Sequence, residues 1–98
     1  MLGLGSLFKL EKKVNEYLQF LAQKGFNFGE DAVGFITFGQ QYTNATDEIV
    51  NVAIEITLKA QKEFDGSFFI SLLEMLKENQ IQSRKQAYRF VEERNIMA

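Results

Sequence analysis

The stretch TDEIVNVAIEITLKAQKEF, residues 46–64, decides between two folds for this chain. With a period near 3.6 residues it is a helix whose apolar side chains cover more than half of its circumference. Thr46 suits the N-cap, two acidic residues follow it in the first turn, and Lys59 and Lys62 lie towards the negative end. These end signals favour a helix over residues 47–64, wedged between neighbouring helices or placed in the seam of an oligomer.

The same stretch also fits a strand, because apolar and polar residues alternate strictly along it. The alternating apolar residues are rich in β-branched types and comprise Val50, Val52, Ile54, Ile56 and Leu58. Paired with residues 33–43, such a strand would form a hairpin in an α+β protein of order α-β-β-α-α. We therefore predict an all-α fold and keep the central hairpin as the alternative for residues 33–58.

Four further helices are predicted from the helical spacing of apolar residues. They run from Ser6 to about Lys24, from about Glu30 to Tyr42, from Ser67 to Asn79 and from Ser83 to Asn95. Ser6 and Ser83 suit the N-caps of the first and the last, and Gly25 and Gly66 lie at breaks between helices. The chain is therefore predicted to be a single helical domain, residues 1–98, built as a small bundle of four to five helices.

The predicted helix at residues 30–42 is the least regular of the set. Gly34 and Gly39 interrupt it, and each lowers the helix-forming tendency by up to about 1 kcal/mol relative to alanine. Its apolar residues, Phe35 and Phe38 among them, nonetheless gather on one broad side, and polar residues take the other.

The composition excludes several kinds of chemistry. The sequence contains no cysteine and no histidine, so it lacks the ligands of common zinc and haem sites and the commonest general base. Its serines have no histidine to activate them, and no glycine-rich phosphate loop follows a strand. We expect no enzymatic activity, no cofactor and no metal site.

The charge and hydropathy pattern indicates a cytoplasmic protein. The net charge is −2, and neither a secretory signal nor an apolar run that could span a bilayer is visible. An N-terminal helix lying on a membrane surface is a further alternative, since Leu2 and Leu4 precede an apolar stripe flanked by lysines. Glu11 and Glu16 dilute that basic face, and membrane association is therefore not expected.

The C-terminal stretch QIQSRKQAYRFVEERNI, residues 80–96, contains a helix whose first turns are basic. Two helices joined by a tight turn over residues 67–95 resemble a helix-turn-helix, with Gln80 in place of the usual turn glycine. The resemblance implies a nucleic-acid-binding regulator. The contacts expected are Arg84, Lys85 and Arg89 with phosphates, and Gln86 with a base edge.

The same end of the chain also resembles part of an S4 RNA-binding domain, over about residues 72–97. The family pattern is roughly Ser-Arg-x-x-Ala, followed by a short apolar helix and a closing strand. The matching residues are Ser83, Arg84, Ala87, Arg89, Val91 and Ile96. This resemblance implies RNA as the ligand, whereas a solvated closing helix accounts for the same residues without any ligand.

A surplus of apolar side chains favours association with protein. Ten phenylalanines are many for 98 residues, and contiguous exposed apolar surface marks partner or self-association sites. The residues expected at such an interface are Phe35, Phe38, Val50, Ile54, Leu58, Phe68 and Phe69. We expect a non-catalytic interaction, assembly or regulatory module that acts through apolar helix faces, as a homodimer or with a protein partner. A nucleic-acid-binding regulator is the alternative, and a single tight core would explain the phenylalanines without any partner.

Overall fold

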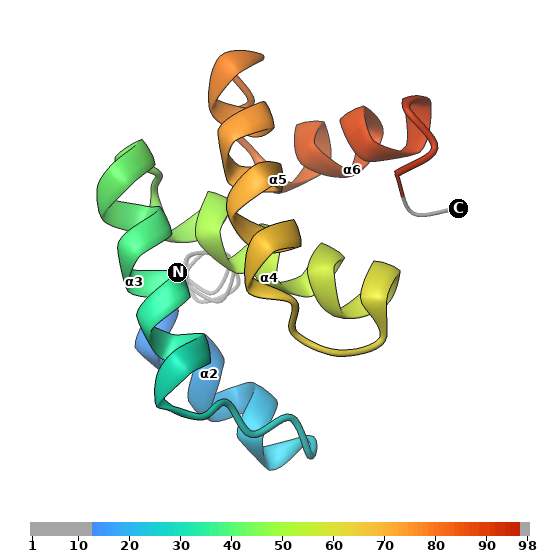
Figure 1. The fold of residues 1–98 in the computed structure, drawn as a ribbon. Helices are drawn as coiled ribbons and strands as arrows, with labels where there is room; N and C mark the ends of the chain where they lie inside the picture. Colours follow the sequence, from blue (N-terminus) through green and yellow to red (C-terminus); the bar gives the residue numbers. More distant parts are fainter. Residues whose placement is uncertain (1–12, 97–98) are drawn as a thin grey trace, which may run out of the picture.

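The computed structural model describes residues 13–96, and within this range the chain forms five α-helices and no strand (Figure 1). The helices are α2 (Val14–Gln23), α3 (Glu30–Thr43), α4 (Asp47–Gln61), α5 (Gly66–Glu78) and α6 (Arg84–Glu93). The all-α prediction is confirmed. The hairpin alternative is wrong, because residues 33–43 lie in α3 and residues 50–58 lie in α4. The predicted start of the first helix at Ser6 lies outside the described residues.

α4 occupies the centre of the molecule and packs against α2, α3, α5 and α6. Because neighbours lie on several sides, apolar residues around much of the helix are buried: Ile49, Val50, Val52, Ala53, Ile54 and Ile56. Thr46 caps the helix as predicted, since its Oγ1 accepts a hydrogen bond from the Ile49 N–H at 3.2 Å. The helix ends at Gln61, earlier than predicted, because Lys62 adopts a left-handed φ of 69° and donates its N–H to the Leu58 carbonyl.

α3 and α5 lie side by side in close contact (Figure 1). The contact depends on Gly39, because a Cβ added there would lie 2.9 Å from the Cδ1 atoms of both Ile70 and Leu73. Ile36, one helical turn earlier on the same side of α3, is buried as well. One side of α3 is therefore part of the core, and a glycine sets how closely the two helices approach.

α6 packs mainly on α4, and its buried stripe is the predicted one: Ala87, Phe90 and Val91. Ser83 caps it as predicted, with Oγ accepting a hydrogen bond from the Gln86 N–H at 3.2 Å. In the turn before it, Gln80 has a left-handed φ of 57°, and the Ile81 N–H reaches the Leu76 carbonyl at 2.9 Å. Gln80 thus adopts the conformation for which helix ends usually employ glycine.

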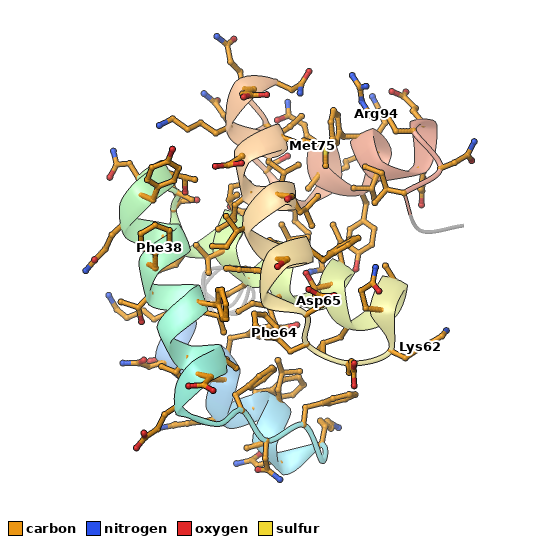
Figure 2. The ribbon with its side chains drawn as sticks, viewed as in Figure 1. Phe38, Lys62, Phe64, Asp65, Met75 and Arg94 are labelled. Atoms are coloured by element: carbon orange, nitrogen blue, oxygen red, sulfur yellow. The ribbon has the colours of Figure 1, made fainter. Side chains whose placement is uncertain are left out.

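Three aromatic rings close one end of the core. Phe28, from the connection after α2, meets Phe64 edge to face at a centroid distance of 5.6 Å. Phe64 lies beside the start of α5 and packs on Phe69 at 5.4 Å (Figure 2). These phenylalanines pack against the core, whereas others, considered next, do not.

Candidate functional site

A row of aromatic side chains is exposed on the flank of α3, beside its contact with α5. The row consists of Phe35, Phe38 and Tyr42, whose side chains share one side of the helix because they are spaced by three and four residues. Their exposed fractions are 44%, 55% and 60%. The rings of Phe38 and Tyr42 stack at a centroid distance of 5.5 Å, with an angle of 11° between their planes. We call these three residues the aromatic stripe; Figure 2 shows Phe38 on α3.

The aromatic stripe borders a hollow on the same helix. The hollow is lined by Glu30, Asp31, Gly34, Phe35 and Phe38, and we call it the Gly34 hollow. The space next to the Gly34 backbone is empty, because a Cβ added there would meet no atom within 4 Å. One surface therefore carries both a projecting ring, at Phe38, and a recess beside it.

Phe35 is held in place by the start of α5. A Cβ added at Gly66, the first residue of α5, would lie 2.6 Å from the Phe35 ring. The ring therefore covers the backbone of Gly66 with one side and exposes the other. This contact fixes the wall of the Gly34 hollow before any partner binds, which lowers the entropy that binding would remove.

The charge along α3 is uneven. Glu30 and Asp31 lie in its first turn, and the helix contains no basic residue. At the other end Gln40 is turned inward, where its Nε2 donates to Asp47 Oδ1 at 2.8 Å. The stripe thus runs from an acidic N-terminal end to an uncharged end at Tyr42.

The structure places the predicted interface residues in three environments. Phe35 and Phe38 are exposed, and Leu58 and Phe68 are partly buried against the core. Val50, Ile54 and Phe69 have no exposed surface, so their assignment to an interface is corrected: α4 and α5 lie between neighbouring helices and bury them inside the protomer.

Two residues of the site were missed by sequence reasoning. Tyr42 shares the spacing of Phe38 at i,i+4, and this spacing is a signal that could have found it. In the sequence Gly34 and Gly39 are alike, since each lowers the helix-forming tendency. The structure separates them, because a Cβ at Gly39 would clash with α5 whereas a Cβ at Gly34 would meet no atom.

The predicted nucleic-acid contact Arg84 already has partners within the chain. Its guanidinium forms an ion pair with Glu55 of α4, and its backbone N–H donates to Glu48 Oε2 at 3.0 Å. The hydrogen bond to Glu55 is the main reason that the pKa of Arg84 is raised. A carboxylate therefore lies at the first N–H of α6, where a phosphate would bind at the start of a helix.

Arg84 belongs to a polar cluster that joins three helices. The polar cluster comprises Tyr17 of α2, Glu55 and Lys59 of α4, and Arg84 and Tyr88 of α6. Lys59 Nζ and Arg84 Cζ lie 4.9 and 5.2 Å from the centroid of the Tyr88 ring. Burial and, after it, the nearby Glu55 carboxylate raise the pKa of Tyr17 to about 12. This arrangement ties α2 and α6 to α4.

The other predicted contacts on α6 are exposed. Gln86 is engaged through its Oε1, which accepts a hydrogen bond from the Gln82 N–H at 2.8 Å. Lys85 and Arg89 are exposed on the helix. Of the four side chains predicted to read nucleic acid, the structure thus engages two within the chain.

Residues 13–96 contain neither a helix long and apolar enough to cross a membrane nor a group of three metal-ligating side chains. No curated protein and no solved structure matches the chain. A family model does match it, over residues 9–97, and that model describes DUF6123, a family of unknown function. Because the match covers most of the sequence, the chain belongs to the DUF6123 family.

Proposed function

We propose that this protein is a non-catalytic interaction module that docks a protein partner on the aromatic stripe of α3. The observation that carries the proposal is the exposure of three aromatic side chains on one helix, in a chain that buries apolar residues all around α4. Aromatic residues with an apolar body are the usual anchors of protein interfaces.

The size of the stripe supports a specific but modest interface. About half of each ring is exposed, and an aromatic side chain buries about 150–250 Å², so the three expose roughly 300 Å². Patches of about 300–600 Å² on monomers are often functional. Covering roughly 300 Å² is worth about 7 kcal/mol at about 25 cal/mol per Å². This gain is of the order of the cost of association, about 4–15 kcal/mol, so polar contacts around the stripe must contribute.

The stripe is also preorganised for binding. Phe35 rests on Gly66, and Phe38 stacks on Tyr42, so these rings are constrained in the free protein. A partner would therefore fix fewer side chains than on a surface of flexible residues. The polar cluster around Arg84 gives the nucleic-acid alternative less support, because Glu48 and Glu55 lie at the start of α6.

The proposal is tested by site-specific photo-cross-linking in the native host. Phe38 is replaced by the photoreactive p-benzoylphenylalanine, and the same replacement at Phe26 provides the control. Phe26 is also an exposed phenylalanine, at 42%, but it lies outside α3. We expect a defined covalent protein adduct from position 38 and none from position 26, with the partner identified by mass spectrometry. No adduct at position 38, or equal adducts at both positions, would refute the proposal.

A further inference from the structure

We infer that the partner docked on the aromatic stripe is a second copy of this chain, with its α3 antiparallel to the first. The inference rests on the proposed function and specifies its partner. It begins from the presence of a projecting ring and a recess on the same surface, Phe38 and the Gly34 hollow. In a dimer with two-fold symmetry the same patch of both copies is in contact. The ring of each copy can therefore enter the recess of the other.

The spacing along α3 supplies a register for this contact. Asp31, Phe35, Phe38 and Tyr42 follow one another at intervals of four, three and four residues, the pattern of a two-helix seam. In an antiparallel pair centred between residues 36 and 37, Phe38 lies opposite Phe35 of the second copy. Gly34 lies beside that layer, so the Phe38 ring of each copy enters the Gly34 hollow of the other.

The two ends of the stripe complement each other in the same register. Tyr42 lies opposite Asp31 of the second copy, so its hydroxyl can donate a hydrogen bond to that carboxylate. This is a charge-assisted bond between a neutral donor and an ionised acceptor. The acidic end of each α3 thereby meets an uncharged donor, and no cation from another protein is required.

The charges of α3 favour the antiparallel direction over the parallel one. A parallel pair would bring Glu30 and Asp31 of the two copies together at the positive ends of both helices. An antiparallel pair separates these acidic turns by nearly the length of the helix and pairs opposite ends of the helix dipoles. Repulsion between like charges placed opposite each other therefore disfavours the parallel pair.

The area sets the expected strength of the dimer. Two stripes contribute roughly 600 Å² of aromatic surface, against about 1,600 Å² in a standard interface. Gln41 follows Phe38 at i+3, is exposed, and extends the contact. Because this area is below that of a standard interface, we expect a weak, concentration-dependent dimer rather than a permanent one.

The first test fills the Gly34 hollow without disturbing the fold. Gly34→Gln places a good helix former where a Cβ meets no atom within 4 Å, so the protomer should fold at least as well as before. Sedimentation equilibrium over a dilution series should show a dissociation constant raised at least tenfold. The control, Ser71→Gln, changes an exposed residue of α5 and should leave the dissociation constant unchanged. An unchanged constant for Gly34→Gln, or a wild type that stays monomeric at millimolar concentration, overturns the inference.

The second test measures the direction of the helices in the dimer. The chain has no cysteine, so Thr37→Cys and Glu30→Cys each give one attachment site for a spin label. In the antiparallel dimer the two labels at residue 37 lie at nearly the same position along the axis, whereas those at residue 30 are offset by about 20 Å along it at about 1.5 Å per residue. A pulsed dipolar measurement should therefore give a clearly longer distance at residue 30. Equal distances at the two positions would indicate a parallel pair and overturn the register.

The photo-cross-linking experiment separates the two proposals. An adduct at position 38 with the mass of two copies of the chain supports both of them. An adduct with a different protein leaves the proposed function standing and overturns the second-copy inference. The absence of any adduct at position 38 overturns the proposed function and the inference together.

Discussion

The sequence marks two surfaces of this molecule for a partner, and the structure treats them differently. The flank of α3 beside its contact with α5 carries the aromatic stripe, whose three residues are about half exposed. The start of α6 carries Arg84, whose guanidinium pairs with Glu55 and whose backbone N–H donates to Glu48. Figure 2 shows Phe38 on α3 and Arg94 at the end of α6 on opposite sides of the view. The apolar surface is left uncovered by the described helices, whereas the charged one is used within the chain.

The difference shows how to weigh exposed residues. A surface cation can be satisfied by a carboxylate from another helix at little cost, and then it helps to hold the fold. Water offers an exposed aromatic ring no comparable compensation. Three such rings in one row form a contiguous apolar patch, unlike single apolar residues scattered over a surface. The uncovered rings are therefore the stronger sign of a partner.

The largest expected effect tests whether the stripe is dispensable for folding. Phe69→Ala removes a side chain with no exposed surface and should lower the free energy of unfolding by about 3–5 kcal/mol. Phe38→Ala should lower it by less than about 1 kcal/mol, because that ring is 55% exposed. Urea denaturation followed by circular dichroism measures both. Comparable losses would show that Phe38 belongs to the core and would remove the basis for a docking surface.

The two glycines of α3 should respond to alanine with opposite signs. At Gly39 the new methyl group meets Ile70 and Leu73 at 2.9 Å, and overpacking costs about 1–3 kcal/mol, partly offset by helix propensity. At Gly34 the methyl group meets nothing, so Gly34→Ala should raise the free energy of unfolding by up to about 1 kcal/mol. The measurement is chemical denaturation at concentrations below those at which the inferred dimer would form. The same sign at both positions would mean that the two sides of α3 are not as different as described.

A smaller effect separates a structural role of Arg84 from a binding role. Arg84→Ala removes a partly exposed ion pair and should lower the free energy of unfolding by about 0.5–1 kcal/mol. Lys85→Ala, its exposed neighbour on α6, should change it by less than about 0.5 kcal/mol and is the matched control. A double-mutant cycle with Glu55→Gln should show a coupling close to the whole effect. Two additive substitutions would mean that the pair contributes nothing to the fold.

The smallest effect concerns the response to alkaline pH. The folded-state pKa of Tyr17 is about 12, above the unfolded value of about 10, so the folded state keeps a proton that the unfolded state loses. The free energy of unfolding should therefore fall as the pH rises from about 10 to about 12. Lys59, whose pKa is also raised in the folded state, acts in the same direction. Tyr17→Phe should make this fall shallower without abolishing it, and an unchanged slope would show that burial does not raise the pKa of Tyr17 in the folded state.

Much of the fold was predictable because its signals are local. Thr46 and Ser83 cap their helices as predicted, and the buried stripe of α6 follows the spacing of its apolar residues. The choice of helix over strand for α4 also rested on local signals, the cap and the charges at its ends. The end of α4 was misplaced because a left-handed Lys62 has no sequence signature.

The site was less predictable because it depends on contacts between distant segments. Arg84 and Glu55 are far apart in sequence, and no spacing rule connects them. Gly34 and Gly39 differ only in which side of α3 faces α5, and this depends on the packing of the whole bundle. The same packing buries Val50, Ile54 and Phe69, which a count of apolar residues had placed at an interface.

The most direct test of the account is a dilution series of amide proton–nitrogen correlation spectra of the wild-type protein. If the stripe docks a second copy, the resonances that shift or broaden with concentration will cluster on the exposed side of α3, around Gly34, Phe38 and Tyr42. The resonances of α6 around Arg84 will stay constant over the same range. Spectra that do not change up to millimolar concentration, or changes centred on α6, would contradict the claim that α3 carries the docking surface for a second copy.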